Sequence, residues 1–146
     1  MSLIKIALVD ADFFFSYFGS DQYTEHAKRL FNKIIQKEIT IEVASELFDD
    51  LINGYRADGF PFKDICDIIE AIKSTNLKVI PSTPTIVLEA MRWYIKHKGS
   101  RKLHYFDSFH VATAIHSNHK NLITTDSYIH KIAEEAKINV IHLRTF

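Results

Sequence analysis

The sequence predicts an α/β sandwich, a three-layer α/β/α arrangement with helices on both faces of a mainly parallel five-stranded sheet. Short apolar runs, typical of buried strands, alternate along the chain with longer amphipathic segments. Such alternation favours parallel strands connected by helices. With 146 residues, of which 47% are hydrophobic, the chain is long enough for one well-buried core. We therefore expect residues 1–146 to form a single domain.

Composition and charge exclude several classes of protein. The lone Cys66 allows neither an internal disulfide nor a zinc site built from cysteines, and it suits a reducing, cytoplasmic environment. No apolar run approaches transmembrane length, and no basic segment followed by an apolar one opens the chain. Because 18 Lys and Arg balance 18 Asp and Glu, net charge recruits neither nucleic acid nor membrane. Any binding of a polyanion must come from a local basic patch.

The first apolar run, residues 4–9, is nearly apolar on both faces, as expected of a central parallel strand. It ends at Asp10-Ala11-Asp12, and the ligand sites of open α/β sheets gather at the carboxyl ends of their strands. The aromatic segment 13–18 follows at once. Such rings are able to stack on unpaired bases, but beside a central strand we expect them to pack in the core.

Two helices and a strand are expected next. Asp21 is the predicted cap of a helix over residues 21–38, a short strand covers 39–41, and a second helix runs to about Ala57. At 3.6 residues per turn, the second helix has one apolar and one polar face. The polar face comprises Glu42, Glu46, Asp49, Asp50 and Asn53. It is a solvated acidic surface unless it faces a cleft, in which case Glu46 is the candidate for chemistry.

A further helix over residues 61–75 follows a break at Gly59, and a strand covers 77–80. The spacing of its apolar residues predicts that this helix buries Phe62, Ile65, Cys66, Ile68, Ile69 and Ile72. The next helix begins with Thr83 as cap and Pro84 in the first position. Its predicted core residues are Val87, Ala90, Met91 and Tyr94, and its predicted end is Gly99.

The segment from Ala90 to Phe106 contains no acid but several cations. These cations are Arg92, Lys96, Lys98, Arg101 and Lys102. Positive charge is expected at a helix C-terminus for structural reasons alone. Since the run continues past the predicted helix end toward Asp107, we also consider it as a patch that binds RNA phosphates.

The last third of the chain places two acids at the ends of predicted elements. A helix beginning near Tyr105 has Asp107 in its first turn, where backbone N–H groups favour a carboxylate. A strand over 122–125 ends at Asp126, which precedes a short helix and a final strand over 138–141. The simplest interpretation makes Asp107 a helix-start acid and Asp126 a cap. If both ends lie on the same side of the sheet, the two carboxylates converge.

Three histidines near this region need an interpretation. His116 and His119 are close enough in sequence to reach one metal ion, but no cysteine or obvious third ligand accompanies them, so we expect surface histidines. His110 lies one turn after Asp107. It either orients that carboxylate or is packed in the core, and we favour packing.

Scattered carboxylates at the ends of predicted elements form an all-oxygen ligand set. Asp10, Glu46, Asp107 and Asp126 would repel one another unless a cation compensates them. Oxygen ligands suit a hard cation such as Mg²⁺ or Mn²⁺, and such an ion activates water for attack on a phosphodiester. The sequence contains no Gly-rich phosphate loop, dinucleotide fingerprint or Ser/His/Asp arrangement to compete with this interpretation.

Four segments resemble the acidic motifs of PIN domains. These segments are Val9-Asp10-Ala11-Asp12, Ser45-Glu46-Leu47, Phe106–Ala114 and Ile123–Asp126. The resemblance covers essentially the whole chain and is closest to the small PIN proteins that are toxins of type II toxin–antitoxin pairs. It implies a sheet in the order 3-2-1-4-5, with Asp10 and Asp126 on neighbouring strands. It also implies a divalent-metal endoribonuclease, usually a homodimer, that a co-produced antitoxin protein inhibits.

The resemblance further assigns roles to individual residues. The acidic quartet that binds metal and catalyses hydrolysis is Asp10, Glu46, Asp107 and Asp126, and Thr124 is a supporting hydroxyl. The family more often has Asn at the position of Asp12, so Asp12 is either an additional ligand or a cap of the next helix. Glu42 and Asp50 remain substitutes for Glu46, because all three lie on one predicted helix face.

Two other functions compete with the nuclease. Asp10-x-Asp12 after an apolar strand also begins phosphatases of the haloacid-dehalogenase type, in which the first Asp is the nucleophile. The aromatic residues that follow fit that class poorly. The second rival is a PIN-like module that binds RNA or protein without cutting, and the presence of all four acids argues against it.

Overall fold

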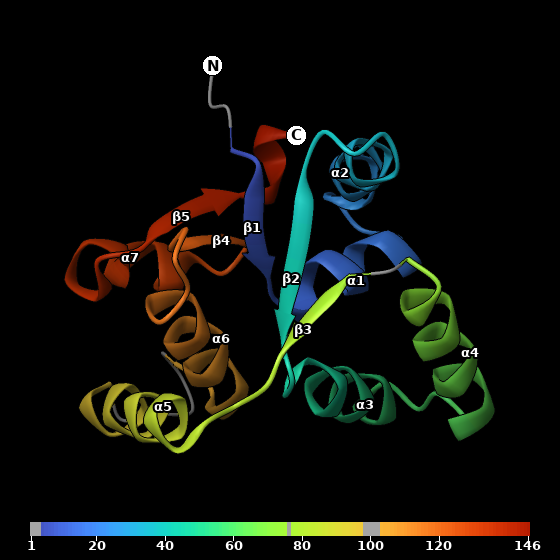
Figure 1. The fold of residues 1–146 in the computed structure, drawn as a ribbon. Helices are drawn as coiled ribbons and strands as arrows, with labels where there is room; N and C mark the ends of the chain where they lie inside the picture. The colour runs from blue at the N-terminus through green and yellow to red at the C-terminus, as the bar shows by residue number, and fades with distance from the viewer. Residues whose placement is uncertain (1–3, 76, 98–102) are drawn as a thin grey trace.

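In the part of the chain that the structure describes, residues 4–75, 77–97 and 103–146, five parallel strands form one sheet (Figure 1). The structure is a computed structural model. The strands are β1 (Ile6–Val9), β2 (Thr40–Ala44), β3 (Lys78–Ile80), β4 (Asn121–Thr124) and β5 (Asn139–His142). Their order in the sheet is β3-β2-β1-β4-β5. This confirms the predicted fold class and strand order.

Helices cover both faces of the sheet, so the fold has three layers (Figure 1). One layer consists of α1 (Ala11–Phe18), α2 (Thr24–Ile35), α3 (Leu47–Ala57) and α4 (Phe62–Lys73). The opposite layer consists of α5 (Pro84–Lys96), α6 (Tyr105–Ile115) and α7 (Ser127–Ala136). A short 3-10 helix, η1 (Leu143–Thr145), follows β5 and packs against α2.

The central strand β1 explains the three-layer core. Ala7 and Val9 face the core under α1–α4, whereas Leu8 faces the core under α5–α7, and all three are fully buried. Successive side chains of a strand point to opposite faces. A strand that is covered on both sides therefore has to be apolar throughout, which is the pattern of residues 4–9.

Helix α6 is buried on almost every side. All residues from Ser108 to Ala114 are buried. Val111 and Ala114 pack with the sheet residues Leu8 and Leu122 in one cluster, and Phe109 and Ala112 pack with α5 in another. Because α6 lies between the sheet and α5, its N-terminal turn, which carries Asp107, has a rigid support.

Several element predictions were wrong in detail. Helix α2 begins at Thr24 instead of residue 21, because Asp21 accepts a hydrogen bond from the backbone N–H of Tyr23 (2.7 Å) in the preceding turn. Strand β2 extends to Ala44, so Glu42 belongs to a strand and not to the acidic helix face. Thr83 caps α5 as predicted by accepting from the N–H of Ile86 (3.3 Å), but the predicted end at Gly99 lies outside the described residues.

Some residues that were predicted to be buried are exposed. Phe62 is 62% exposed and Cys66 is also exposed, because α4 contacts the core chiefly through Ile65 and Ile72. Val87 on α5 is 36% exposed. A helix at the rim of the fold buries a narrower stripe than its apolar residues suggest.

No helix in the described residues is long and apolar enough to cross a membrane.

Candidate metal and active site

Asp10 lies at the centre of an acidic site between the carboxyl ends of β1 and β4. It directly follows β1 and caps α1, since its Oδ1 accepts a hydrogen bond from the N–H of Asp12 (3.1 Å). Its Oδ2 accepts a hydrogen bond from the hydroxyl of Thr124, the last residue of β4. Asp10 is only 2% exposed. The two adjacent parallel strands therefore bring the carboxylate and the hydroxyl together, although 114 positions separate them in sequence.

Asp12 joins the site instead of capping the helix. Its Oδ2 accepts hydrogen bonds from the hydroxyl of Thr125 (2.7 Å), the hydroxyl of Thr124 (3.2 Å) and the N–H of Thr125 (3.3 Å). The alternative that Asp12 only caps α1 is wrong, because Asp10 occupies the cap position. The Asp12 carboxylate instead links the start of α1 to the β4–α7 turn.

Asp107 and Asp126 are both held at helix starts. Asp107 Oδ2 accepts from the N–H of His104 (3.1 Å), forming a capping box at the start of α6. Asp126 Oδ1 accepts from the N–H groups of Tyr128 (2.8 Å) and Ile129 (2.9 Å) and caps α7. The structural roles that the sequence predicted for these two acids are therefore both present. They do not prevent a second role, because each carboxylate has another oxygen.

The carboxylates perturb one another electrostatically. Burial raises the pKa of Asp10 well above its usual value, and the charges of Asp12 and Asp107 raise it further, while the Thr124 hydroxyl lowers it. Burial likewise raises the pKa of Asp107 to about 6. The charges of Asp126 and Asp12 add to that shift, whereas His110 and the His104 N–H oppose it. Asp10, Asp12, Asp107 and Asp126 thus form one acidic cluster.

Glu46 is at the expected end of β2, but its carboxylate is bound elsewhere. The hydroxyl of Ser82, in the β3–α5 loop, donates to Glu46 Oε1 (2.7 Å) and Oε2 (2.5 Å), and Ser45 also donates to Oε1 (3.1 Å). Glu46 is not among the groups that shift the pKa of Asp10 or Asp107. The structure therefore does not bring Glu46 into the acidic cluster.

The two substitutes for Glu46 are also engaged. Glu42 lies on β2, where its carboxylate contacts His119 Nε2 (2.8 Å) and Lys78 Nζ (3.6 Å). Asp50 Oδ2 contacts His110 Nε2 (2.9 Å). His110 is fully buried, as predicted, but it pairs with α3 through Asp50 and does not hydrogen-bond Asp107.

His116 and His119 do not share a metal site. His116 Nε2 lies 3.4 Å from Glu89 Oε1, whereas His119 pairs with Glu42. His116 is exposed as expected, but His119 is half-buried because that pairing draws it against β2.

The chemistry of the acidic cluster fits a hard divalent cation, although its geometry is not that of an assembled metal site. Within residues 4–75, 77–97 and 103–146, no three His, Cys, Asp or Glu side chains are placed to hold a metal ion together. The donors are nevertheless all oxygens, as Mg²⁺ and Mn²⁺ require. Asp12, Asp107 and Asp126 each keep one oxygen without a hydrogen bond to the described residues. A cation would relieve the repulsion that raises their neighbours' pKa values.

The basic run predicted to bind phosphate is only partly described. Arg92 is exposed on α5. Lys96 forms an ion pair with Glu135 on α7 and lies over the ring of Trp93, 5.5 Å from its centroid. Lys98, Arg101 and Lys102 lie outside the described residues. Both cations are exposed, but Lys96 already has an acidic partner on α7, which leaves Arg92 as the better candidate of the two for a phosphate contact.

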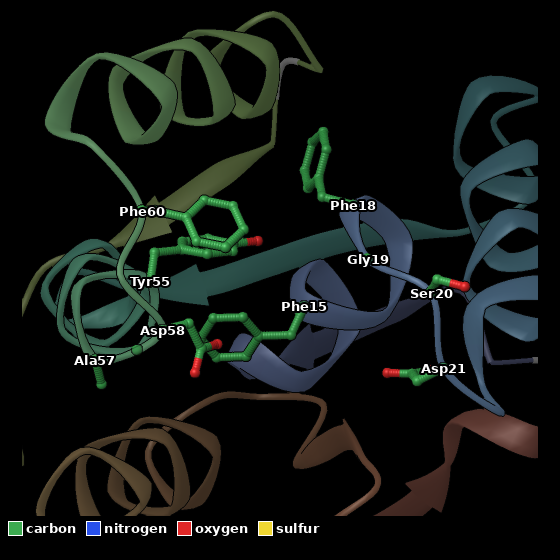
Figure 2. A pocket seen from close by; sticks show the side chains of 10 residues that line it. Phe15, Phe18, Gly19, Ser20, Asp21, Tyr55, Ala57, Asp58 and Phe60 are labelled. Atoms are coloured by element: carbon green, nitrogen blue, oxygen red, sulfur yellow. The ribbon is translucent and has the colours of Figure 1, made fainter.

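An aromatic pocket lies between the C-terminal ends of α1 and α3, and no residue of the acidic cluster lines it (Figure 2). It has a volume of about 480 Å³. Its lining includes Phe15, Phe18, Asp21, Tyr55, Asp58 and Phe60. Burial and then the charge of Asp58 raise the pKa of Tyr55 to about 12, and its buried hydroxyl has no partner among the described residues. Phe13 and Phe14 are buried in the core as predicted, whereas Phe18 reaches the surface.

Comparison with known families identifies the class. The family model for the PIN domain matches residues 7–135, which is most of the chain and includes the whole acidic cluster. PIN domains are in general nucleases and typically use divalent metal ions. This chain belongs to the PIN domain family. No curated protein matches it.

Proposed function

We propose that this PIN domain is an endoribonuclease that hydrolyses RNA phosphodiester bonds with Mg²⁺ or Mn²⁺. One observation carries the proposal. The Asp10 carboxylate is buried beside Asp12 and within the field of Asp107, and no cationic side chain is among the groups that shift its pKa. A fold does not keep such charge together for stability, because both burial and mutual repulsion disfavour it. It is explained by a cation that binds there.

The roles of the cluster follow from its hydrogen bonds. Asp12, Asp107 and Asp126 would each hold the ion through the carboxylate oxygen that accepts no hydrogen bond from the described residues. When bound, the ion would activate water and stabilise negative charge on the phosphodiester. Thr124 fixes the Asp10 carboxylate by hydrogen bonding, so that Asp10 faces the other acids from the end of β1. Helix starts at Asp107 and Asp126 keep those two carboxylates in place.

Glu46 completes the quartet that the resemblance of the sequence to PIN domains implies. Its two carboxylate oxygens share the hydroxyl proton of Ser82, so Glu46 can join the other acids only if its side chain turns away from Ser82. We therefore assign Glu46 the most distant position in the site. The exposed Arg92, with the cations that follow it in sequence, is proposed to contact RNA phosphates.

The proposed biological role is that of a toxin in a type II toxin–antitoxin pair, acting in the cytoplasm and inhibited by an antitoxin protein. A homodimer is proposed for the active form. Helix α5 supports it, because Val87, Leu88 and Ile95 are 36%, 56% and 69% exposed. Their spacing places them along one side of the helix. An apolar stripe of this kind is typical of a protein–protein contact.

The phosphatase alternative is disfavoured by the position of Asp10. A nucleophilic carboxylate needs an oxygen that can reach a phosphorus atom. Both oxygens of Asp10 are engaged in hydrogen bonds, and the residue is 2% exposed.

Cleavage of single-stranded RNA by the purified protein tests the proposal. We expect cleavage in Mn²⁺ or Mg²⁺, none in excess EDTA, and none by Asp107→Asn. Asp64→Asn is the matched control, because Asp64 is the first-turn acid of α4 and lies exposed, outside the cluster. Cleavage that persists in EDTA would contradict the metal mechanism. Hydrolysis of p-nitrophenyl phosphate without RNA cleavage would favour the phosphatase, and RNA binding without cleavage would favour the non-catalytic module.

A further inference from the structure

A second group of polar side chains lies beside the acidic cluster, at the C-terminal end of β5. His142, the last residue of β5, is the register partner of Thr124, whose hydroxyl binds Asp10. His130 on α7 contacts the carbonyl oxygen of Thr124 through Nε2 (3.1 Å). The charge of Asp12 is also among the groups that act on His142. This group therefore borders the site directly, although no sequence motif marks it.

The group continues across η1 to α2. The rings of His130 and His142 are stacked with centroids 5.3 Å apart, and Tyr23 meets the His142 ring at its edge, 5.2 Å away. Arg29 on α2 donates to His26 Nδ1 (2.9 Å) and to the carbonyl oxygen of Phe146 (2.7 Å). We call this group the β5–α2 surface. It comprises Tyr23, His26, Arg29, His130, His142 and Arg144.

Hydrogen bonding makes the β5–α2 surface a set of donors. His142 Nδ1 accepts from the N–H of Arg144 (3.1 Å), so the proton of its neutral ring is on Nε2. His26 Nδ1 accepts from Arg29, because a guanidinium only donates, and its proton is likewise on Nε2. Neither Nε2 has a hydrogen-bond acceptor among the described residues. The guanidinium of Arg144, which is exposed, has no acidic partner there either.

Two permanent cations, Arg29 and Arg144, lie exposed on this surface. Burial lowers the pKa of His142, and the charges of Arg144, His130 and His26 lower it further. The one acidic group that opposes this shift is Asp12. Another acid on α2, Glu25, pairs with Lys28 (3.2 Å). A surface with donors, cations and few acceptors matches an anion that carries several acceptor oxygens.

We propose that the β5–α2 surface binds phosphate groups of single-stranded RNA and leads the strand to the acidic cluster. This inference rests on the proposed function, and it adds where the substrate lies. Repulsion between RNA and the carboxylates opposes binding, so a neighbouring phosphate has to be held by donors close to them. The chain is neutral overall, with 18 cationic and 18 acidic side chains, and only a local surface can supply this attraction.

RNA binding by a double variant tests the proposal. His142→Asn keeps an acceptor for the N–H of Arg144 and thus the start of η1, and Arg144→Gln removes an exposed charge. Arg29 is left unchanged because it binds the Phe146 carbonyl. Arg56→Ala is the matched control, since Arg56 is an exposed arginine on α3 that packs over Phe62. Equal melting temperatures of the three proteins establish that all are folded.

The binding measurement is fluorescence anisotropy of a labelled single-stranded RNA in EDTA, at several KCl concentrations. We expect the double variant to bind at least about fivefold more weakly near 0.1 M KCl, as removal of one charge-assisted hydrogen bond predicts. The slope of log K against log[KCl] should flatten by about 0.7 for each phosphate that the variant no longer binds. In Mn²⁺, the KM for RNA should rise while kcat stays near that of the parent. Arg56→Ala should match the parent throughout.

The outcomes separate this inference from the proposed function. If the parent binds RNA and the double variant binds with the same affinity and slope, the inference is wrong whether or not RNA is cut. An equal loss of affinity in Arg56→Ala would also overturn it, because the effect would then be one of net charge. If the parent binds RNA through this surface but does not cleave it in Mn²⁺, the inference stands and the nuclease proposal fails. A parent that binds no RNA overturns both.

Discussion

Replacing Asp107 by Asn should stabilise the metal-free protein at neutral pH and strongly reduce its stabilisation by metal. The pKa of Asp107 is raised from 3.8 to about 6. Because the pKa of this carboxyl is higher in the folded than in the unfolded protein, its protonated form stabilises the folded state. That stabilisation is fully present below pH 3.8 and is lost as the pH rises through about 6. The difference between a pKa of 3.8 and one of about 6 corresponds to about 3 kcal/mol of stability lost at pH 7.5.

Two effects reduce the gain. The side chain of Asn can still accept the hydrogen bond from the N–H of His104, but it lacks the charge that favours a helix start, a loss of about 0.3–1 kcal/mol. The favourable interaction with His110, which lowers the pKa of Asp107, is also removed. We therefore expect a net stabilisation of up to about 2 kcal/mol at pH 7.5. For a chain of this length that is a rise in Tm of about 4–8 °C.

The assay is thermal unfolding in EDTA at pH 5 and pH 7.5, for the parent, Asp107→Asn and the control Asp64→Asn. The parent and the control should lose stability between the two pH values, and Asp107→Asn should lose less. Adding Mn²⁺ at a hundredfold excess over Kd should stabilise the parent by about 2.7 kcal/mol and the Asn variant much less. Equal pH dependence and equal metal shifts in all three proteins would refute the reasoning, because Asp107 would then be only a helix-start acid.

Three further substitutions have expected outcomes. Thr124→Val removes the hydroxyl that donates to the buried Asp10 carboxylate. In urea unfolding at pH 7.5 the variant should be less stable by about 1–3 kcal/mol, and it should not cleave RNA. Cleavage at the rate of the parent would contradict the supporting role of Thr124. Tyr55→Phe removes a buried hydroxyl without a partner among the described residues, so unfolding should show a change of less than about 1 kcal/mol, in the stabilising direction. A large loss of stability would reveal a hidden partner. Arg92→Ala should flatten the salt dependence of RNA binding by about 0.7 units if Arg92 contacts a phosphate, and an unaltered slope would limit that cation to helix-end electrostatics.

Sequence alone was sufficient for the fold and for the position of most acids along it. Apolar runs such as residues 4–9 and the alternation of strands with helices predict a parallel sheet, because a strand covered on both faces has to be apolar throughout. The placement of Asp107 in a first turn and of Asp126 as a cap also follows from local rules, since helix starts expose N–H groups that attract carboxylates. Both placements are confirmed.

Local patterns failed where a side chain's partner is remote in sequence. Glu42 was assigned to an acidic helix face, but it lies on β2 and pairs with His119, 77 positions away. Asp50 was assigned to the same face and pairs with the buried His110 of α6. The exposure of Phe62 and Cys66 likewise depends on how far α4 extends beyond the sheet. Spacing along one helix cannot show which of its faces another element will cover.

Only the tertiary structure decided the composition of the acidic cluster and what borders it. It joins Asp12 to the β4–α7 turn, binds Glu46 to Ser82, and sets His142 beside Thr124. Each of these residues can be found in the sequence, but every one of these pairs joins residues that are far apart along the chain. They arise because parallel strands bring their carboxyl ends to one edge of the sheet, while the register between strands determines which side chains meet there.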